Sequence, residues 1–297
     1  MRAAAVRLEI FDAALSTPAS ASGTVIGPTG ELFVGQYVAN APILRYLAAL
    51  TTLTPNGAIT GVGLNYPEMM TFVDEELWVA STAYEVCTTE TESLIRIAFD
   101  GDGGASAAGT FSTGLVGANR GMLWAPDTRS LYVTQCEPVN TIQHYAVAAD
   151  HTVTQLAATT ADMLNNPHGM VITPWGELFV ANAGTPANAG NAILRFTLDA
   201  QGNPTPNGQI TGGDLDLPVN IEFAPWGELF VVNNGNATIS RFTFDGSHAA
   251  TPSRSPFQLT APTTSGSVGV GFLTLAPGAS TPPVAADASA DDGGLEE

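Results

Sequence analysis

The chain has 297 residues, of which 44% are apolar and 12% charged, so it is long enough to bury a large core. All nine basic residues are Arg, and the absence of Lys excludes a Lys Schiff base, a P-loop Lys and a Lys-rich nucleic-acid surface. The formal net charge of −19 at pH 7 argues against nucleic acid and anionic membranes as partners, because both would repel the protein.

The ends and composition of the chain bear on its location. No run of about 18 apolar residues occurs, so we expect no membrane insertion. Arg7 and Glu9 interrupt the N-terminal sequence before a secretory apolar segment can form. The low charge, the abundant Thr, Asn and Gly and the absence of Lys nevertheless resemble the composition of secreted bacterial proteins. We expect a monomer that is secreted, periplasmic or at the cell surface, with a cytoplasmic location as the alternative.

One short pattern recurs along the chain: a turn followed by Leu, an aromatic residue and Val. It occurs at residues 30–34, 76–79, 130–133, 176–180 and 227–231. The repeat distance of about 45 to 54 residues is that of a four-stranded propeller blade. The sequence therefore predicts an all-β protein with the fold of a β-propeller.

The two most regular repeats show what a blade contains. Residues 167–180 match residues 218–231 position by position, and each segment predicts an inner strand, a turn and a second strand. A polar loop then leads to residues 193–199 or 239–245, whose alternation predicts a half-buried third strand. Residues 206–212 supply a further turn and the outermost strand. Each repeat is thus predicted to be a four-stranded antiparallel meander.

Five complete repeats are visible, and the two ends of the chain suggest a sixth. Residues 268–275 resemble an inner strand without a second strand behind it, and residues 5–11 alternate like a strand without a turn partner. We expect these segments to form a composite closing blade, which gives a six-bladed ring without free edges. A five-bladed or incompletely closed ring is the alternative. Residues 1–277 are then one domain, and residues 278–297 are an acidic disordered tail.

The repeat resembles the six-bladed propellers of the NHL-repeat and SMP-30 (gluconolactonase)-like group. The resemblance lies in Pro167-His-Gly-Met170 and in the Gly-Glu-Leu-Phe-Val-Ala-Asn run at 176–182, and it extends over about residues 20–275. Because enzymes and binding modules share this repeat, it implies a fold more than an activity.

Function in a propeller lies at one end of its axis, where the residues that enter the inner strands converge. Alignment of the repeats on their second strands places Ser22, Glu68, Arg120, His168, Asn220 with Val219, and Val268 at these positions. We call them the ring positions. Glu68, Arg120, His168 and Asn220 are the strongly polar members, and they predict a polar axial pocket for a small or extended polar ligand.

The resemblance to SMP-30-like enzymes implies a divalent cation, Ca, Mg or Zn, on the axis. Transferred by position, Glu68 and Asn220 are the candidate metal ligands, since hard cations prefer oxygen. Arg120 and His168 depart from that pattern, and an Arg in the ring would repel a cation. A single ring His also falls short of the His-rich zinc site of the related amidating lyases.

Each ring residue also has a structural interpretation that stays open. Glu68 and Arg120 come from adjacent repeats and form a buried ion pair in this interpretation. His168 is then a hydrogen-bonded axial residue rather than a general base, and Asn220 a turn residue that bonds its own backbone.

Two further groups of residues stand out. Arg45, Arg96, Arg195 and Arg241 occupy one position of the third strand, where the third repeat has His144. Because the position repeats, we expect these Arg residues to pair between blades as part of the architecture. Cys87 and Cys136 follow the second strands of neighbouring repeats, and we expect a disulfide between them, with free thiols as the alternative.

Three functions follow from this interpretation. The first is a ligand-binding propeller that uses Glu68, Arg120, His168 and Asn220. The second is a metal-assisted lactone hydrolase or lyase acting on a small polar substrate, with His168 as acid or base and Arg120 stabilising an anion. The third is a protein-interaction scaffold, which would be indifferent to changes in the ring.

Overall fold

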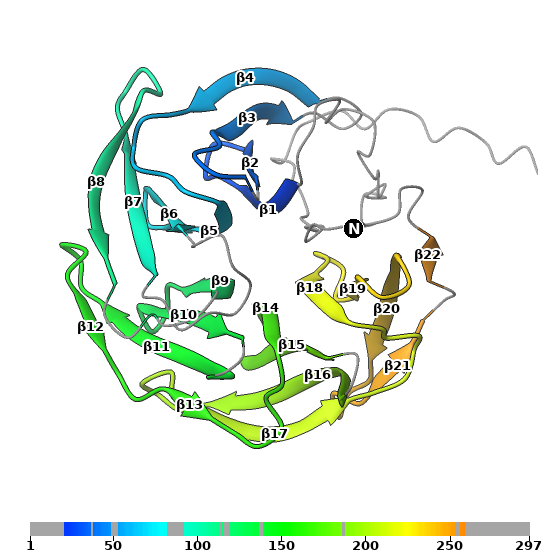
Figure 1. The fold of residues 1–297 in the computed structure, drawn as a ribbon. Coiled ribbons are helices and arrows are strands. Elements are labelled where there is room, and N and C mark those ends of the chain that lie inside the picture. The colour runs from blue at the N-terminus through cyan, green and yellow to red at the C-terminus, as the bar shows by residue number, and fades with distance from the viewer. Residues whose placement is uncertain are drawn as a thin grey trace, which may run out of the picture.

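The computed structural model describes residues 21–36, 38–48, 53–81, 92–112, 115, 119–136, 139–185, 188–253 and 256–258. All regular elements in these residues are β-strands, and they form five antiparallel sheets around a central axis (Figure 1). The predicted fold class, an all-β propeller of four-stranded antiparallel blades, is therefore confirmed. Within the same residues, no helix is long and apolar enough to cross a membrane.

The first three blades follow the predicted meander from the axis to the rim. Blade 1 consists of β1 (Ala21–Ile26), β2 (Glu31–Gln36), β3 (Ile43–Ala48) and β4 (Leu53–Ile59). Blade 2 consists of β5 (Pro67–Val73), β6 (Glu76–Ser81), β7 (Ser93–Phe99) and β8 (Ala105–Phe111). Blade 3 consists of β9 (Asn119–Ala125), β10 (Ser130–Gln135), β11 (Thr141–Val147), β12 (Val153–Gln155) and β13 (Thr159–Thr160).

The last two described blades have the same order. Blade 4 consists of β14 (Pro167–Ile172), β15 (Glu177–Thr185), β16 (Asn188–Leu198) and β17 (Pro204–Ile210). Blade 5 consists of β18 (Pro218–Phe223), β19 (Leu229–Asn233), β20 (Thr238–Phe244), β21 (Ala250–Pro252) and β22 (Phe257–Gln258). The segments predicted to close the ring, residues 5–11 and 268–275, and the predicted tail, residues 278–297, lie outside the described residues.

The core lies in the layers between blades. In β15, Leu178 and Val180 pack in a cluster shared with blade 3, whereas Phe179 and Ala181 pack in a cluster shared with blade 5. Successive side chains of a strand point to opposite faces, so a strand between two neighbouring blades must be apolar at every position. The repeated Leu-aromatic-Val sequence meets this requirement in each blade.

A charged pair recurs in four of the five blades. A Glu at the start of the Leu-aromatic-Val segment binds an Arg of the third strand, whose guanidinium also lies 5.0–5.7 Å from the centre of an aromatic ring of that segment. The Glu–Arg pairs are Glu31–Arg45 (2.8 Å), Glu76–Arg96 (2.7 Å), Glu177–Arg195 (2.6 Å) and Glu228–Arg241.

The expectation that these Arg residues pair between blades was wrong, because each ion pair joins two strands of one blade. The register explains this: Arg195 is directly opposite Phe179, so it shares a face with Phe179 and with Glu177 two residues earlier. The contact with the next blade is instead a hydrogen bond to backbone. Nη1 of Arg195 donates to the carbonyl of His248 at 3.2 Å, and Nη1 of Arg45 donates to the carbonyl of Gly103 at 2.7 Å.

Blade 3 replaces the charged pair with neutral groups. His144 takes the place of Arg, and its Nε2 lies 2.9 Å from the hydroxyl of Ser130, which takes the place of Glu. The His144 ring stacks on Tyr132, whose hydroxyl donates to the carbonyl of Gly202 in blade 4. Burial lowers the pKa of His144, so His144 and Tyr132 make this contact with blade 4 without a charge.

Candidate functional site

The five inner strands β1, β5, β9, β14 and β18 lie around the axis (Figure 1), and each contains a β-bulge near its start. In β9 the extra residue is Arg120, because Asn119 and Gly121 are opposite consecutive residues of β10. In β14 the bulge contains His168. A bulge redirects side chains and is frequent next to active sites. The ring positions predicted from the sequence therefore coincide with a repeated irregularity of the backbone.

Two glycines allow the inner strands of blades 3, 4 and 5 to approach one another closely. A Cβ on Gly121 would collide with the carbonyl oxygen of His168, which also accepts a hydrogen bond from Oγ1 of Thr134 at 2.7 Å. A Cβ on Gly169 would lie 3.0 Å from the carbonyl oxygen of Val219 and 3.1 Å from Cα of Asn220. The approach at Gly121 requires glycine, and the approach at Gly169 leaves little room for a side chain, so the ring positions of three successive blades come together.

The loops that lead into the inner strands are held by asparagines at the ends of the second strands. Oδ1 of Asn182 accepts the backbone N–H of Asn165 at 2.8 Å, and Oδ1 of Asn233 accepts that of Asp216 at 3.2 Å. Asn166, which directly precedes Pro167, has a φ of 51°. These bonds fix the direction in which the chain enters the strands and therefore the position of the ring residues.

The structure describes three of the four predicted polar ring residues in full. Arg120 and His168 are buried, with 8% and 7% of their surface exposed, and Asn220 is partly buried on β18. Glu68 lies in the bulge of β5, but its side chain is outside the described part of the chain. The structure thus brings Arg120, His168 and Asn220 to one end of the axis.

His168 is neutral in this environment. Burial is the main cause that lowers its pKa, and the positive charge of Arg120 lowers it further, to about 3. Its Nδ1 is buried and has no hydrogen-bond partner among the described residues. An imidazole nitrogen that is neutral and without a partner can accept or donate one hydrogen bond, according to the tautomer.

Sequence reasoning missed Asn119, which is fully buried next to Arg120. Its backbone N–H donates to the carboxylate of Glu92 at 2.9 Å, and its Oδ1 accepts from Gln135 at 3.4 Å. In blades 2, 4 and 5 the corresponding first residue of the inner strand is a proline. The departure from the repeat was visible in the sequence and could have identified blade 3 as unusual.

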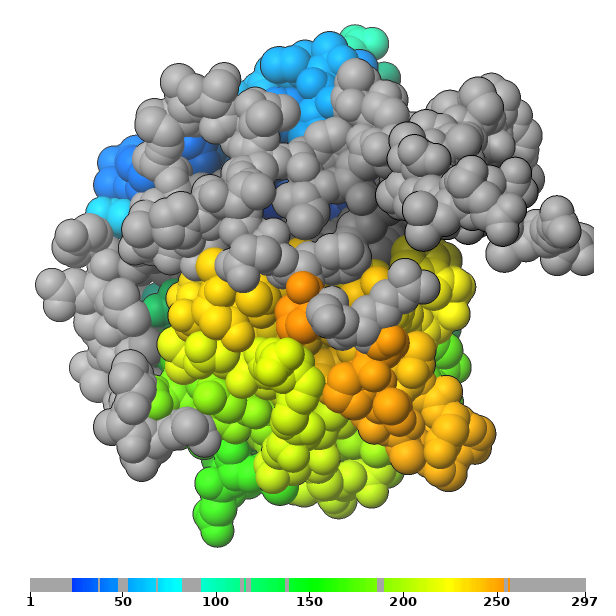
Figure 2. Space-filling model, turned by 90° about the vertical axis from the view of Figure 1, so that its right-hand side faces the viewer, coloured from blue at the N-terminus to red at the C-terminus, as the bar shows by residue number. Residues whose placement is uncertain are grey.

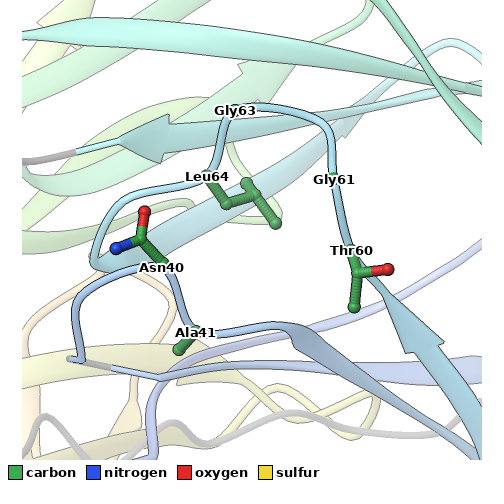
Figure 3. Close-up of a pocket in the computed structure, with 6 residues that line it drawn as sticks. All are labelled: Asn40, Ala41, Thr60, Gly61, Gly63 and Leu64. Carbon is green, nitrogen blue, oxygen red and sulfur yellow. The ribbon is translucent and has the colours of Figure 1, made fainter.

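A cavity of about 220 Å³, lined by none of the ring positions, lies at the edge of blade 1 (Figure 3). Asn40 and Ala41 of the β2–β3 loop form one side, and Thr60, Gly61, Gly63 and Leu64 of the β4–β5 connection form the other. No charged or imidazole side chain lines it, so the ring offers more chemistry than this cavity.

Of the two cysteines, Cys136 is fully buried at the end of β10 and is disulfide-bonded. Cys87, the other cysteine of the chain, lies outside the described residues.

Comparison with known proteins supports the fold. The chain matches no protein-family profile and no curated protein sequence. Similar solved structures include a proposed 6-phosphogluconolactonase from Bacteroides uniformis, with 13% identity and a TM-score of 0.60 over 80% of this chain and 72% of that one. A periplasmic gluconolactonase from Pseudomonas aeruginosa has 14% identity and a TM-score of 0.55 over 80% of this chain and 86% of that one.

A third similar structure is a catalytically inactive variant of virginiamycin B lyase from Staphylococcus aureus with quinupristin, in which a histidine is replaced by alanine. It has 17% identity and a TM-score of 0.52 over 82% of this chain and 71% of that one. At such identities the likeness shows the fold alone, and the class of protein is a β-propeller whose structural neighbours include lactonase-like and lyase-like proteins. Membership of the NHL/SMP-30 group stays a prediction.

Proposed function

We propose that this propeller binds a small anionic or polar molecule at the axial end formed by Arg120, His168 and Asn220. The observation that carries the proposal is His168, a buried and neutral imidazole whose Nδ1 has no described partner and whose neighbour is a positive charge. A buried polar atom without a hydrogen bond costs about 1–3 kcal/mol, and native proteins retain few of them. A ligand that bonds Nδ1 would remove this cost.

The charges of the site favour an anion as one end of the ligand. Arg120 supplies a guanidinium that is positive at all ordinary pH values and can bind a carboxylate or phosphate through two hydrogen bonds. Asn220 supplies a neutral amide on β18, the inner strand of blade 5. Glu68, predicted for the same ring, is the remaining candidate contact.

The same residues do not fit a divalent cation. No group of three His, Cys, Asp or Glu side chains that could hold a metal ion occurs within the described residues. Of the two predicted ligands, Asn220 offers a single neutral oxygen, and Arg120 would repel a cation next to His168. We therefore derive no chemistry through a metal.

The test is a binding screen of small carboxylates, hydroxy acids, lactones and phosphate esters by thermal shift, followed by calorimetry. We expect an anionic compound to bind, and we expect R120Q and H168Q to weaken that binding about tenfold or more, because each removes a direct contact. H144Q is the matched control, since His144 is also buried and neutral but bonds Ser130 in another part of blade 3.

An outcome in which both ring variants bind like the wild type would contradict the proposal and favour the interaction scaffold. Loss of binding in H144Q as well as in H168Q would mean that general destabilisation, not a contact, explains the effect. Each variant is therefore compared with its own melting temperature without ligand.

An enzyme is the second candidate function, and the combination of a neutral His with an Arg favours it. In an elimination, His168 would take a proton from the carbon next to a carbonyl while Arg120 stabilises the anion that forms; in lactone hydrolysis, it would take the proton of the attacking water while Arg120 stabilises the tetrahedral anion. The inactive histidine variant of virginiamycin B lyase gives this idea support at the level of the fold. A pKa of about 3 makes His168 a weak base until an anionic substrate raises it, so binding is the first proposal. Turnover of a lactone that is lost in H168A and retained in H144Q would change that order.

A further inference from the structure

One position of the inner strand carries an acidic residue in blade 5 alone among the described blades. Glu222 of β18 is directly opposite Phe230, the aromatic residue of the Leu-aromatic-Val segment. The residues opposite the same aromatic position in blades 1 to 4 are Val25, Thr71, Leu123 and Val171. A position that is apolar or a neutral hydroxyl elsewhere thus holds a carboxyl group, and this departure marks a feature that the fold itself does not require.

Glu222 differs from the other buried or partly buried Glu residues, of which Glu92 accepts the backbone N–H of Asn119. Glu31, Glu76, Glu177 and Glu228 each bind an Arg. No hydrogen bond or ion pair to Glu222 occurs among the described residues, although the side chain is partly buried. Burial alone raises the pKa of its carboxyl to about 7. An unpartnered acid of this kind destabilises the protein without ligand. Its presence therefore suggests that it contributes to function, for example by binding a ligand.

The place of Glu222 connects it to the ring. Asn220 and Glu222 are two residues apart on β18, and their partners Val232 and Phe230 are two residues apart on β19, so both side chains belong to the same face of blade 5. Two residues of a strand span about 6–7 Å. Asn220 in turn lies close to the inner strand of blade 4. Its Oδ1 would be 3.4 Å from a Cβ on Gly169, which directly follows His168. The polar positions therefore continue from His168 on β14 to Asn220 and Glu222 on β18. Strand β18 belongs to blade 5, which is drawn in yellow and orange in Figures 1 and 2.

We propose that Glu222 binds an amine of the axial ligand, so that the ligand is a small zwitterion with its anionic group at Arg120 and its ammonium group at Glu222. The anionic end rests on the proposed function above, whereas the amine contact is new. Among ligand groups, an ammonium gains most from a buried carboxyl without a partner, because it supplies both charge and hydrogen-bond donors. A second anion at Glu222 would be repelled, and a hydroxyl group would leave the charge unbalanced.

The test uses three matched series of small probes over several chain lengths: ω-amino acids, the same carboxylates without the amine, and the same amines without the carboxylate. Calorimetry at mildly alkaline pH compares the wild type with E222Q and with E75Q, which removes the same charge from an exposed position. We expect an ω-amino acid to bind the wild type and E75Q about tenfold or more tightly than its matched carboxylate. In E222Q the two should bind equally.

The outcomes separate the two proposals. If the wild type does not distinguish the amino acid from the carboxylate, or if E222Q retains the preference, the inference is overturned, while carboxylate binding lost in R120Q preserves the proposed function. If amines bind through Glu222 without any effect of R120Q, the amine contact stands and the anion contact fails. If no series binds at millimolar concentration, both are overturned.

Stability provides the control for folding. We expect E222Q to melt at the same temperature as the wild type or higher, because it removes a desolvated acid without removing a bond. A second variant, E222V, introduces the residue that blade 4 has at this position, and it should also fold and lose the preference for the amine. Folded E222V that still prefers the amino acid would refute the assignment.

Discussion

Two sets of polar side chains are buried or partly buried in this propeller, and they differ in how they are bound. The Glu–Arg pairs repeat in four blades, and each carboxylate is bound within its own blade. The axial residues Arg120, His168, Asn220 and Glu222 each occur once, at positions where the other blades carry different residues. His168 and Glu222 in particular have polar atoms without described partners. A bound charged pair that repeats from blade to blade indicates architecture, whereas polar residues that occur once, at positions where the other blades differ, indicate a site.

The pKa values express the same contrast. Burial raises the pKa of Glu76, Glu177 and Glu228, but hydrogen bonds outweigh it and lower each pKa: those from the paired Arg and from a Trp in all three, with Trp175 ahead of Arg195 at Glu177. At the axis, burial prevails: it lowers the pKa of His168 to about 3 and raises that of Glu222 to about 7. The paired Glu residues are held in their charged form, whereas burial favours the neutral forms of His168 and Glu222, and Arg120 stays charged.

Removal of one Arg of a Glu–Arg pair should have the largest effect on the free energy of unfolding. In R195M we expect a loss of about 2–3 kcal/mol in the free energy of unfolding, because Glu177 remains partly buried without its counter-charge and the bond to His248 of blade 5 is lost. Urea denaturation measures it. H168Q should cost less than about 1 kcal/mol at neutral pH, since it removes no described side-chain hydrogen bond.

The double variant R195M/E177Q tests the cause of the R195M effect. Because it also removes the stranded carboxylate, it should recover part of the loss. A double variant that is no more stable than R195M would show that packing against Phe179, not charge, explains the effect.

The second prediction concerns the stability of the protein at low pH, where we expect a somewhat smaller effect than in R195M. The folded state disfavours protonation of His168, whose pKa is about 3 against 6.5 for an ordinary His. The unfolded chain therefore binds more protons, and the stability contributed by neutral His168 is lost as the pH falls below 6.5 toward 3. We expect the wild type to lose about 2 kcal/mol more than H168Q between pH 6.5 and pH 4.5, because one pKa unit corresponds to about 1.4 kcal/mol.

The Glu–Arg pairs begin to lose stability only at the lower end of this window, and they do so equally in the wild type and H168Q, so the difference between the two proteins reports His168. Urea titrations at several pH values measure the slope, and H144Q reports the part due to the other buried histidine. Equal slopes in the wild type and H168Q would mean that His168 is not held neutral by burial.

The repeat was readable from the sequence because its signals are local. Alternation, turn residues and the Leu-aromatic-Val segments predicted the blades, and alignment of the repeats placed Arg120, His168 and Asn220 at one end of the axis. The pairing of Arg195 within its blade was not readable, because it depends on the register between two strands. A position in a repeat identifies a site, but not the partner of each side chain.

The hydrogen bonding and the protonation of the axial groups could not be predicted from the sequence, for a different reason. His168 in Pro-His-Gly is equally compatible with a bonded and an unbonded ring, and only the packing of β9 against β14 shows its Nδ1 buried. Glu222 was overlooked because a polar residue two positions after Asn220 fits the alternation of a half-exposed strand. Burial is a property of the assembled blades, and the pKa of each group follows from it.

Metal removal is the change for which we expect the smallest effect. If the axial site recognises an anion through Arg120, a chelator should leave the melting temperature of the purified protein unchanged, and added Ca, Mg or Zn should not raise it, because the guanidinium repels a cation. Elemental analysis of the same sample is the control for metal that the chelator does not reach. A stoichiometric metal with a chelator-sensitive melt would instead make Glu68 and Asn220 ligands. The axis would then be a second satisfied polar network rather than an open site, and the contrast with the Glu–Arg pairs would disappear.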